Sequence, residues 1–223
     1  MNRVFAKIMN RYPGEVFVYM DDILVATGDD LKRHRKIVQE ILQMFREESF
    51  FLKLSKCKFE QSSINYLGIR VERGIIHIDP TKRKGLTQWP RTLSNVKEVR
   101  SMLGVLGYQR PFIPHYAHIA APLTALLKKG QTFRWTEECT KVLDTLLTMV
   151  EEDPVLHQPD YSRPFELEVD ASQYATGAIL YQRNDKQCLC PVGYHSQTLN
   201  TAERGYDVHD RELLAVIRGL QRW

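Results

Sequence analysis

The feature that most constrains the fold of this 223-residue chain is an apolar stretch interrupted by two adjacent acids. Residues 16–27 read VFVYMDDILVAT, so Asp21 and Asp22 separate two short apolar runs. A buried carboxylate without a counter-charge is destabilising, because its charge loses its hydration. Two apolar strands around a tight polar link form a β-hairpin. The stretch therefore predicts a hairpin whose acidic tip brings both carboxylates close to one point in space.

Adjacent carboxylates at a hairpin tip have two interpretations. Hard divalent cations prefer oxygen ligands, and two such ions about 3.5–4 Å apart activate a hydroxyl and stabilise a leaving phosphate oxygen. Aspartate also suits a tight turn for purely structural reasons. Taken alone, the turn leaves both a metal site and a structural turn open.

The composition is ordinary for a globular protein, with 43% hydrophobic and 26% charged residues. A chain of this length holds one large domain or two or three small ones. No apolar run approaches the 18 residues of a membrane span, and the first residues, MNRVFAKIMNRYPG, lack the apolar stretch of a signal peptide. The four cysteines indicate a reducing compartment rather than a disulfide framework. We therefore expect a protein that is not secreted and has no membrane partner.

The net charge of the chain is only +4, but its basic residues are concentrated in the middle of the sequence. Residues 81–134 contain 10 Lys and Arg residues and one acidic residue, Glu98, whereas acids outnumber bases in residues 135–223. A basic block between acid-bearing segments is typical of a part that contacts phosphates while its neighbours hold metals. A solvated basic face that binds nothing explains the charge equally well.

The first two thirds of the chain mix helical and strand patterns, which predicts an α+β fold. Residues 31–48 have helical periodicity, and residues 50–78 have the composition of short strands with turns. Helical patterns follow up to residue 152, and Ser94 is the expected N-cap of the helix SNVKEVRSMLGVLGYQ.

The last third of the chain has a proline-rich segment followed mainly by strand patterns. Residues 153–164 contain three prolines and predict an extended linker. Three strand patterns at 165–172, 175–182 and 189–196 predict an antiparallel meander. The closing helix is expected to bury one apolar side, which consists of Leu213, Leu214, Ile217 and Leu220.

Several stretches resemble the reverse transcriptases of gypsy-type (Metaviridae) LTR-retrotransposon Pol polyproteins. Tyr19 to Asp22 in FVYMDDILV resemble the YxDD motif, and HRKIVQEILQMFREESFFLKLSKCKFEQSSINYLG resembles the segment that follows it. VKEVRSMLGVLGYQRPFIPHYAHIAAPLTALLKKGQTFRW resembles the thumb and connecting region. FELEVDAS and YHSQTLNTAERGYDVHDRELLAVI resemble the start of the RNase H domain. The resemblance covers essentially the whole chain in the family's order.

The resemblance implies a fold made of three partial domains. Residues 1–80 would be the C-terminal part of the reverse transcriptase palm, and residues 81–152 the helical thumb and connection. Residues 153–164 would be the linker, and residues 165–223 the N-terminal part of an RNase H-like domain.

In the palm, the resemblance implies that Asp21 and Asp22 are catalytic metal ligands. Tyr19 and Met20 precede them in the motif and are implied nucleic-acid contacts, and Met20 would lie near the primer end. The other implied nucleic-acid contacts of this part are Tyr66, Leu67 and Gly68, which resemble the start of the primer-gripping hairpin, and Lys53 and Lys56, which are candidate phosphate contacts.

In the thumb, Lys97, Arg100 and Arg110 are candidate contacts with the duplex backbone, although ordinary surface charge explains each equally well. YQRPFI departs from the family pattern, which usually has a second aromatic and a second basic residue there. In the C-terminal part, Asp170 matches the first RNase H carboxylate, and Glu212 matches the second. Both would be catalytic metal ligands.

The family uses a third carboxylate in each site, from an upstream palm strand and from a strand beyond Glu212. We find neither in these residues, so we expect little or no polymerase or RNase H activity from this chain alone. In the full polyprotein the function would be RNA-directed DNA synthesis coupled to RNA-strand hydrolysis. The alternatives are a catalytically inactive nucleic-acid-binding remnant and an inert scaffold or pseudogene product.

The resemblance also implies cofactors, partners and a location. Each complete site would hold two Mg²⁺ or Mn²⁺ ions. The partners would be an RNA template, a DNA primer, their RNA–DNA hybrid, deoxynucleoside triphosphates and the rest of the Pol polyprotein. Family replication is cytoplasmic, in virus-like particles, and the DNA product must reach a nucleus.

Overall fold

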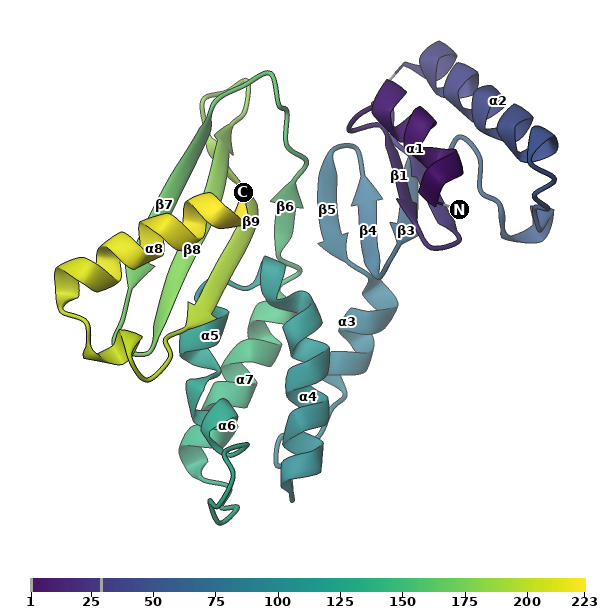
Figure 1. The fold of residues 1–223 in the computed structure, drawn as a ribbon. Coiled ribbons are helices and arrows are strands. Elements are labelled where there is room, and N and C mark those ends of the chain that lie inside the picture. Colours follow the sequence, from purple (N-terminus) through teal and green to yellow (C-terminus); the bar gives the residue numbers. More distant parts are fainter. Residues whose placement is uncertain (1, 29) are drawn as a thin grey trace. The chain divides into compact units, whose positions relative to one another are not determined.

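The structure is a computed structural model that describes residues 2–28 and 30–223. Its strands form sheets with the orders β1-β2, β3-β4-β5-β6 and β7-β8-β9 (Figure 1). The mixture of helices and sheets confirms the predicted α+β class. Contacts divide the chain into two compact units, Met1–Leu67 with Val71–Gly74, and Gly68–Arg70 with Ile75–Trp223. We describe each unit separately, as unit 1 and unit 2.

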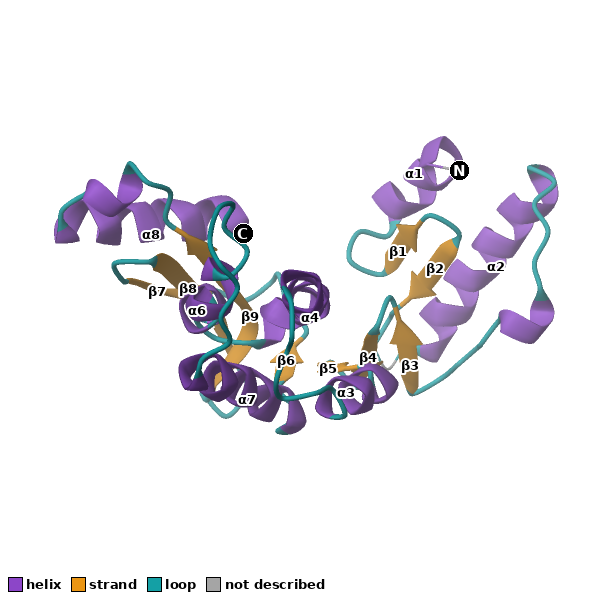
Figure 2. Cartoon of the chain, turned by 90° about the horizontal axis from the view of Figure 1, so that it is seen from below, coloured by secondary structure: helices purple, strands orange, loops and turns teal. Residues whose placement is uncertain are grey.

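Unit 1 is built around the predicted hairpin, which is confirmed. Its strands pair in antiparallel register from Val16↔Val25 to Tyr19↔Asp22. Helix α2 lies alongside β2 (Figure 2), and its side chains pack with those of α1 and β1 in a small core. The elements of this unit are α1 (Asn2–Arg11), β1 (Val16–Tyr19), β2 (Asp22–Val25), α2 (Leu31–Glu47) and β3 (Ser63–Tyr66), and the chain then enters β4 (Ile69–Glu72).

The core of unit 1 follows from the amphipathic pattern of α2. Ile37, Ile41 and Phe45 recur at helical spacing and are buried, and the Phe5 and Phe45 rings meet edge to face at 5.6 Å. The helix begins where the side chain of Asp30 accepts a hydrogen bond from the Arg33 backbone N–H. These contacts hold one side of the hairpin and leave its tip in solvent.

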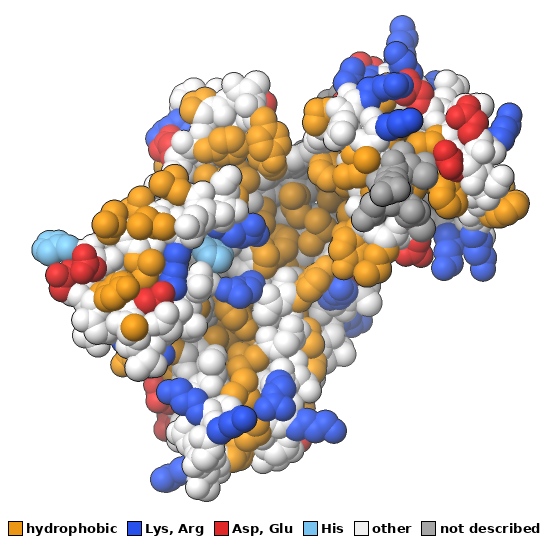
Figure 3. All heavy atoms as spheres, in the orientation of Figure 1, with side chains coloured by type: hydrophobic (Ala, Val, Ile, Leu, Met, Phe, Trp, Pro, Cys, Tyr) orange, Lys and Arg blue, Asp and Glu red, His pale blue; other side chains and the backbone are white. Residues whose placement is uncertain are grey.

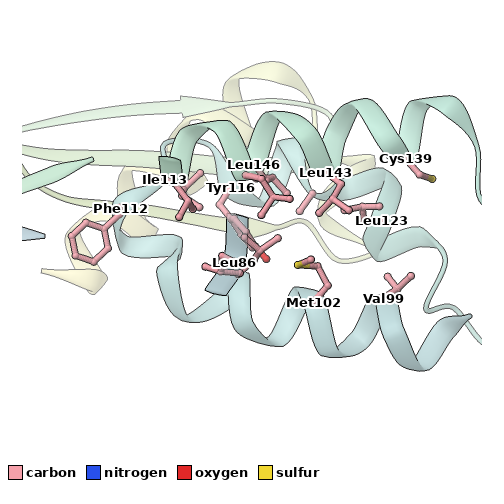
Figure 4. Packing of buried hydrophobic residues seen from close by; sticks show 14 of the residues in the cluster. Leu86, Val99, Met102, Phe112, Ile113, Tyr116, Leu123, Cys139, Leu143 and Leu146 are labelled. Atoms are coloured by element: carbon pink, nitrogen blue, oxygen red, sulfur yellow. The ribbon is translucent and has the colours of Figure 1, made fainter. Parts of the chain in front are cut away.

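Unit 2 begins with a helical part that contains the largest core of the chain. In Figure 4 the side chains of Leu143 and Leu146 on α7 point toward Val99 and Met102 on α4, and all four are fully buried. The elements are β5 (Ile75–Ile78), α3 (Pro80–Thr87), α4 (Val96–Gln109), the short helix η2 (Arg110–Phe112), α5 (Tyr116–Ile119), α6 (Ala121–Ala125) and α7 (Glu137–Glu151).

The start of α4 corrects one expectation. The N-cap is Asn95 rather than Ser94, because the Asn95 side chain accepts a hydrogen bond from the Glu98 backbone N–H at 3.0 Å. The Glu98 carboxylate in turn accepts from the Ser94 backbone N–H at 2.7 Å. This arrangement is a variant of the capping box, because the glutamate at N3 accepts from the residue before the N-cap and not from the N-cap itself.

The predicted linker is also not wholly irregular. Residues Val155–His157 form β6, which pairs antiparallel with β5, with Ile76 opposite Leu156. Leu156 is buried in the helical core. The sequence pattern did not predict this short strand, because prolines flank it on both sides. Proline limits the length of a strand but does not exclude a short paired segment.

Three long strands and one helix complete unit 2, and the predicted meander is confirmed. The strands are β7 (Phe165–Ala171), β8 (Ala175–Arg183) and β9 (Leu189–Thr198), and α8 (Val208–Arg222) covers one face of their sheet (Figure 1). β7 alternates strictly between partly buried and exposed side chains. The acidic residues Glu166, Glu168 and Asp170 therefore lie on one face of the strand, as the alternation of FELEVDAS indicates.

The buried side of α8 was predicted wrongly for three of its four residues, whereas Leu214 is partly buried. Leu213, Ile217 and Leu220 are 58%, 43% and 67% exposed, and the buried residues are Ala215 and Gly219. The reason is close packing: an added Cβ at Gly219 would lie 3.0 Å from Leu167 Cδ2. Small residues let this helix approach the sheet, so its larger side chains face outward. No helix within residues 2–28 and 30–223 has the length and apolarity needed to cross a membrane.

Candidate functional site

The two adjacent aspartates lie at the tip of the β1–β2 hairpin. The pairing of Tyr19 with Asp22 leaves Met20 and Asp21 as a two-residue turn. Met20 has a φ of 53°, in the left-handed region that non-glycine residues seldom adopt, which costs about 1–3 kcal/mol. Both aspartates are exposed, and Met20 is 69% exposed. The hairpin thus presents its carboxylates and the Met20 side chain to solvent.

The structure brings one of these aspartates close to another predicted site residue. Burial raises the pKa of the Tyr66 phenol, and the negative charge of Asp22 raises it further. Tyr66 is the last residue of β3, which follows α2 in unit 1. Asp22 and Tyr66 therefore share one electrostatic environment although they are far apart in the sequence.

The donor chemistry of the hairpin tip fits a hard divalent cation. Mg²⁺ is typically bound by one or two carboxylates together with water and substrate phosphates. Asp21 and Asp22 supply two such carboxylates, exposed and side by side on the chain. Among the described residues, no group of three or more His, Cys, Asp or Glu side chains is arranged to hold a metal ion. The tip therefore offers a partial ligand set.

The other candidates in unit 1 lie between α2 and β4, in short turns and in the strand β3. Lys53 and Lys56 border a single turn of 3-10 helix, Leu54–Lys56, and both are exposed. Neither takes part in any ion pair that we find among the described residues, so both ammonium groups are available to phosphates. Leu67 has a φ of 48° in the turn that follows β3.

Gly68 lies in the turn just before β4 and belongs to unit 2, and its environment explains why a glycine occupies this position. Its φ is 78°, and an added Cβ would overlap the Lys82 Nζ atom and lie 2.8 Å from Lys82 Cε. The Lys82 ammonium also lies over the Tyr108 ring, 4.5 Å from its centroid. Sequence analysis missed Lys82, because no local pattern links a lysine on α3 to a glycine fourteen residues earlier.

The three basic candidates of the thumb differ in their contacts. Lys97 and Arg100 are exposed on α4 and have no ion-pair partner that we find among the described residues. The Arg110 guanidinium donates a hydrogen bond to the Ser196 carbonyl of β9 and lies 5.8 Å from the centroid of the Tyr116 ring. Arg110 therefore has a structural role inside unit 2, and its predicted contact with the duplex backbone stays a prediction.

Asp170 lies on the sheet face that α5 approaches. Its side chain is 65% exposed, and one carboxylate oxygen lies 4.0 Å from His115 Nδ1. Asp170 is paired with Gly177 on β8, and both line a cavity of about 210 Å³ together with His115, His118 and Ser196. The carboxylate thus borders a small polar cavity.

Glu212 belongs to α8, which packs against the other side of the same strand. Gly219 of α8 meets Leu167 and Val169, whose side chains alternate with that of Asp170 along β7. Glu212 is partly buried in the second turn of the helix. The Asp170 side chain therefore lies on the face of β7 opposite to the one that α8 covers, and the pairing of Asp170 with Glu212 as metal ligands stays a prediction.

Comparisons with known proteins identify the two ends of the chain. Residues 1–71 match the family described as reverse transcriptase (RNA-dependent DNA polymerase). Residues 135–223 match the RNase H-like domain found in reverse transcriptase. These matches include the aspartate hairpin in the first segment and Asp170 and Glu212 in the second.

Curated relatives and a solved structure match nearly the whole chain. The chain is 36% identical over 209 residues to the Transposon Tf2-3 polyprotein of Schizosaccharomyces pombe, an alignment that covers 93% of the chain and 16% of that polyprotein. It is 35% identical over 225 residues to the Tf2-7 polyprotein, which it covers to 17%. The solved structure of a foamy viral protease-reverse transcriptase in complex with RNA/DNA hybrid has a similar fold, with a TM-score of 0.83 at 22% sequence identity. The match covers 99% of this chain and 30% of the foamy viral chain.

The chain thus spans about a sixth of the length of these curated relatives, and within that span it carries both matched domains in the same order. The fold, the aspartate hairpin and the sequence identity lead to one assignment. The chain belongs to the reverse transcriptase and RNase H region of gypsy-type LTR-retrotransposon polyproteins.

Proposed function

We propose that this chain contributes to RNA-directed DNA synthesis coupled to RNA-strand hydrolysis in a retrotransposon polyprotein. The observation that carries the proposal is the exposed Asp21–Asp22 pair at the tip of the β1–β2 hairpin in unit 1. Exposed adjacent carboxylates suit nucleotidyl transfer, because divalent ions held there neutralise the developing charge on phosphate oxygens. The hairpin strands fix the carboxylates at the tip, and Met20 would lie beside the primer end.

The proposed substrates and partners follow from the family to which the matched domains belong. They are an RNA template, a DNA primer, the hybrid of the two, deoxynucleoside triphosphates and the remainder of the polyprotein. The cofactor would be Mg²⁺ or Mn²⁺, with Asp21 and Asp22 as ligands in one site and Asp170 and Glu212 in the other. The matched foamy viral enzyme was solved with an RNA/DNA hybrid, which supports this class of partner.

We further propose that the 223-residue chain by itself has little or no catalytic activity. Within the described residues no third acid joins Asp21 and Asp22, or Asp170 and Glu212, in a metal-binding cluster. A cluster that lacks a ligand binds metal weakly and misplaces the nucleophile, and misplacement alone costs about 10²-fold in rate. Nucleic-acid binding would remain, because among the described residues we find ion-pair partners only for Arg83 and Arg91 of the basic residues in 81–134.

Primer extension on an RNA template, with Mg²⁺ or Mn²⁺, tests the catalytic part. We expect the chain and its Asp21→Asn/Asp22→Asn variant to give the same background signal. Clear extension that depends on the aspartates would overturn the proposed inactivity and support the metal site. Fluorescence anisotropy with a labelled RNA–DNA hybrid tests the binding part, and a chain that binds no hybrid at low salt would contradict the proposed function.

A further inference from the structure

The face of β7 that carries Asp170 is supported by an element outside the RNase H-like match. Helix α8 covers the opposite face of this strand, and its outward surface, with hydrophobic side chains, is seen in Figure 3. The Asp170 face is approached instead by α5, which contacts β8 and β9. Because the match begins at residue 135, the surroundings of Asp170 include side chains from the helical part of unit 2.

His115, the residue before α5, stands beside this carboxylate. Its Nδ1 atom lies 4.0 Å from Asp170 Oδ2, and we find no other ion-pair partner of Asp170 among the described residues. The two side chains are 44% and 65% exposed, and both border the cavity of about 210 Å³. Because the ring faces Oδ2, the other carboxylate oxygen is left to a divalent ion.

The backbone of His115 is held in an unusual conformation. Its φ is 52°, in the left-handed region that non-glycine residues seldom adopt. Its carbonyl accepts hydrogen bonds from the backbone N–H groups of His118 and Ile119, at 2.9 and 3.1 Å. The next turn is fastened to the sheet, because the Ala117 backbone N–H donates to the buried Ser196 hydroxyl at 2.9 Å. Residues kept in such conformations by their surroundings are frequent at functional sites.

Gly177 makes room for the imidazole of His115. It is paired with Asp170 across β7 and β8, and an added Cβ at this position would lie 2.9 Å from His115 Nδ1 and 3.4 Å from His115 Cε1. Its own φ is not positive, so the backbone does not require a glycine here. The glycine therefore provides the space that the ring occupies next to Asp170.

We propose that His115 is a positioning residue of the RNase H site, whose ring holds the Asp170 carboxylate in the orientation that a divalent ion needs. This inference rests on the proposed function, in which Asp170 is a metal ligand. Carboxylates that bind metals are themselves held by hydrogen bonds from surrounding residues, and loss of such a partner weakens metal binding about 10–100-fold. The 4.0 Å contact is longer than a hydrogen bond, and contacts of this kind tighten when a site is loaded.

A second histidine of the same cavity provides a matched control. His118 lines the cavity, but within the described part of the chain we find no ion pair between it and Asp170, and its ring lies 6.3 Å from that of Tyr174. His115→Asn removes the imidazole and introduces a residue that tolerates a positive φ. Comparison of His115→Asn with His118→Asn therefore separates the contact with Asp170 from the general loss of a histidine at the cavity.

The test is Mn²⁺ binding by the full, isotopically labelled chain, followed by paramagnetic broadening of the backbone amide resonance at position 177. Asp170→Ala should abolish this broadening. We expect His115→Asn to need about tenfold more Mn²⁺ for the same broadening, and His118→Asn to stay within about twofold of wild type. Gly177→Ala displaces the ring without removing it and should resemble His115→Asn, with thermal melts confirming that each variant is folded.

A second measurement needs no metal. The hydrogen bonds of a histidine ring decide which of its nitrogens carries the proton. We expect NMR spectra of the ring nitrogens to show the His115 proton mainly on Nδ1 in wild type, where it can be donated to Asp170, and less so in Asp170→Ala. A purely structural role of His115 in the turn would leave this signature unchanged.

Equal Mn²⁺ affinities of wild type and His115→Asn, or a His115 ring that does not respond to Asp170→Ala, would overturn the positioning role and leave Asp170 as a metal ligand. A wild-type chain without Asp170-dependent broadening would instead contradict the proposed metal site, and the ring signature would then still decide whether His115 contacts Asp170. The two failures are therefore distinguishable.

Discussion

Arg218 on α8 donates hydrogen bonds to both carboxylate oxygens of Glu203, each at 2.9 Å, and the two side chains are 10% and 15% exposed. Arg218 also donates to the Thr176 hydroxyl of β8 at 3.2 Å. This bidentate pair joins the helix, the sheet and the turn before the helix inside unit 2. Because it is largely shielded from water, it differs from the pairs Arg11–Glu40, Arg83–Asp153 and Lys141–Glu137, in each of which both side chains are at least one quarter exposed.

Removing one member of this pair should destabilise unit 2 strongly. Arg218→Met leaves the Glu203 carboxylate largely buried without its counter-charge, and we expect a loss of about 3 kcal/mol in the free energy of unfolding. Urea denaturation followed by circular dichroism measures it. The exposed pair Lys141–Glu137 is the control, since Lys141→Met should change stability by less than about 0.5 kcal/mol. Similar losses in both variants would contradict the special role of the buried pair.

The packing of α8 predicts opposite outcomes for two substitutions on the same helix. Ala215 is 1% exposed, so Ala215→Leu should overpack the helix–sheet contact and destabilise the protein by about 1–3 kcal/mol. Leu220 is 67% exposed, so Leu220→Ala should stay within about 0.5 kcal/mol of wild type. Thermal melts of both variants check this. A larger loss from Leu220→Ala would mean that the apolar side predicted from periodicity is buried after all.

His195 should make the stability of unit 2 sensitive to acid. Burial lowers the pKa of His195 below its ordinary value of 6.5, and the positive charges of Arg110 and Arg222 lower it further. The unfolded chain therefore binds a proton at a higher pH than the folded chain does, so the free energy of unfolding falls as the pH drops through 6.5 toward the folded pKa. His195→Gln should flatten this fall in urea titrations between about pH 5 and 7. The exposed His209 is the control, and an equal flattening by His209→Gln would contradict the assignment.

The hairpin turn should become more stable with glycine at its strained position. Met20 has a φ of 53°, which glycine adopts without steric strain, so Met20→Gly should stabilise the hairpin by about 1 kcal/mol. Met20→Val should destabilise it, because a β-branched side chain is least compatible with this φ. Hydrogen exchange of the backbone amides in residues 16–25 measures both effects, and faster exchange in Met20→Gly would show that the turn is not strained.

The proximity of Asp22 and Tyr66 can be tested by titration. Burial and the Asp22 charge together raise the pKa of the Tyr66 phenol. Asp22→Asn removes the charge and keeps the shape, so the pKa should move part of the way back toward its ordinary value of 10. NMR titration of ring-labelled tyrosine follows the change. The Asp21→Asn variant serves for comparison, and a Tyr66 pKa that ignores Asp22→Asn would place the two groups apart.

Local patterns predicted the elements whose residues obey a regular period. The hairpin follows from two apolar runs around a polar pair, and the strand Phe165–Ala171 follows from strict alternation. The patterns failed where a neighbouring element in the fold determines the structure or burial of a segment. Ala215 and Gly219 are buried because the sheet lies close to α8, and β6 is a strand because β5 pairs with it. Neither partner can be inferred from the segment itself.

The candidate sites show the same limit. Asp21, Asp22 and Asp170 lie in motifs, so the sequence alone singles them out, but their surroundings depend on distant segments. The Lys82 contact with Gly68 and the His115 contact with Asp170 join parts of the chain that no short motif spans. Motifs thus predict which residues carry chemistry, and the fold decides what stands beside them.

The register of β7 against β8 restricts how this part of the chain can change length during evolution. Asp170 stands opposite Gly177, and acidic and apolar side chains alternate at every position of the strand. A one-residue deletion within β7 would turn Glu166 and Glu168 toward the helix and Leu167 toward water. Insertions and deletions should therefore be tolerated in the turn between Arg183 and Leu189, whereas β7 itself can diverge by substitution alone.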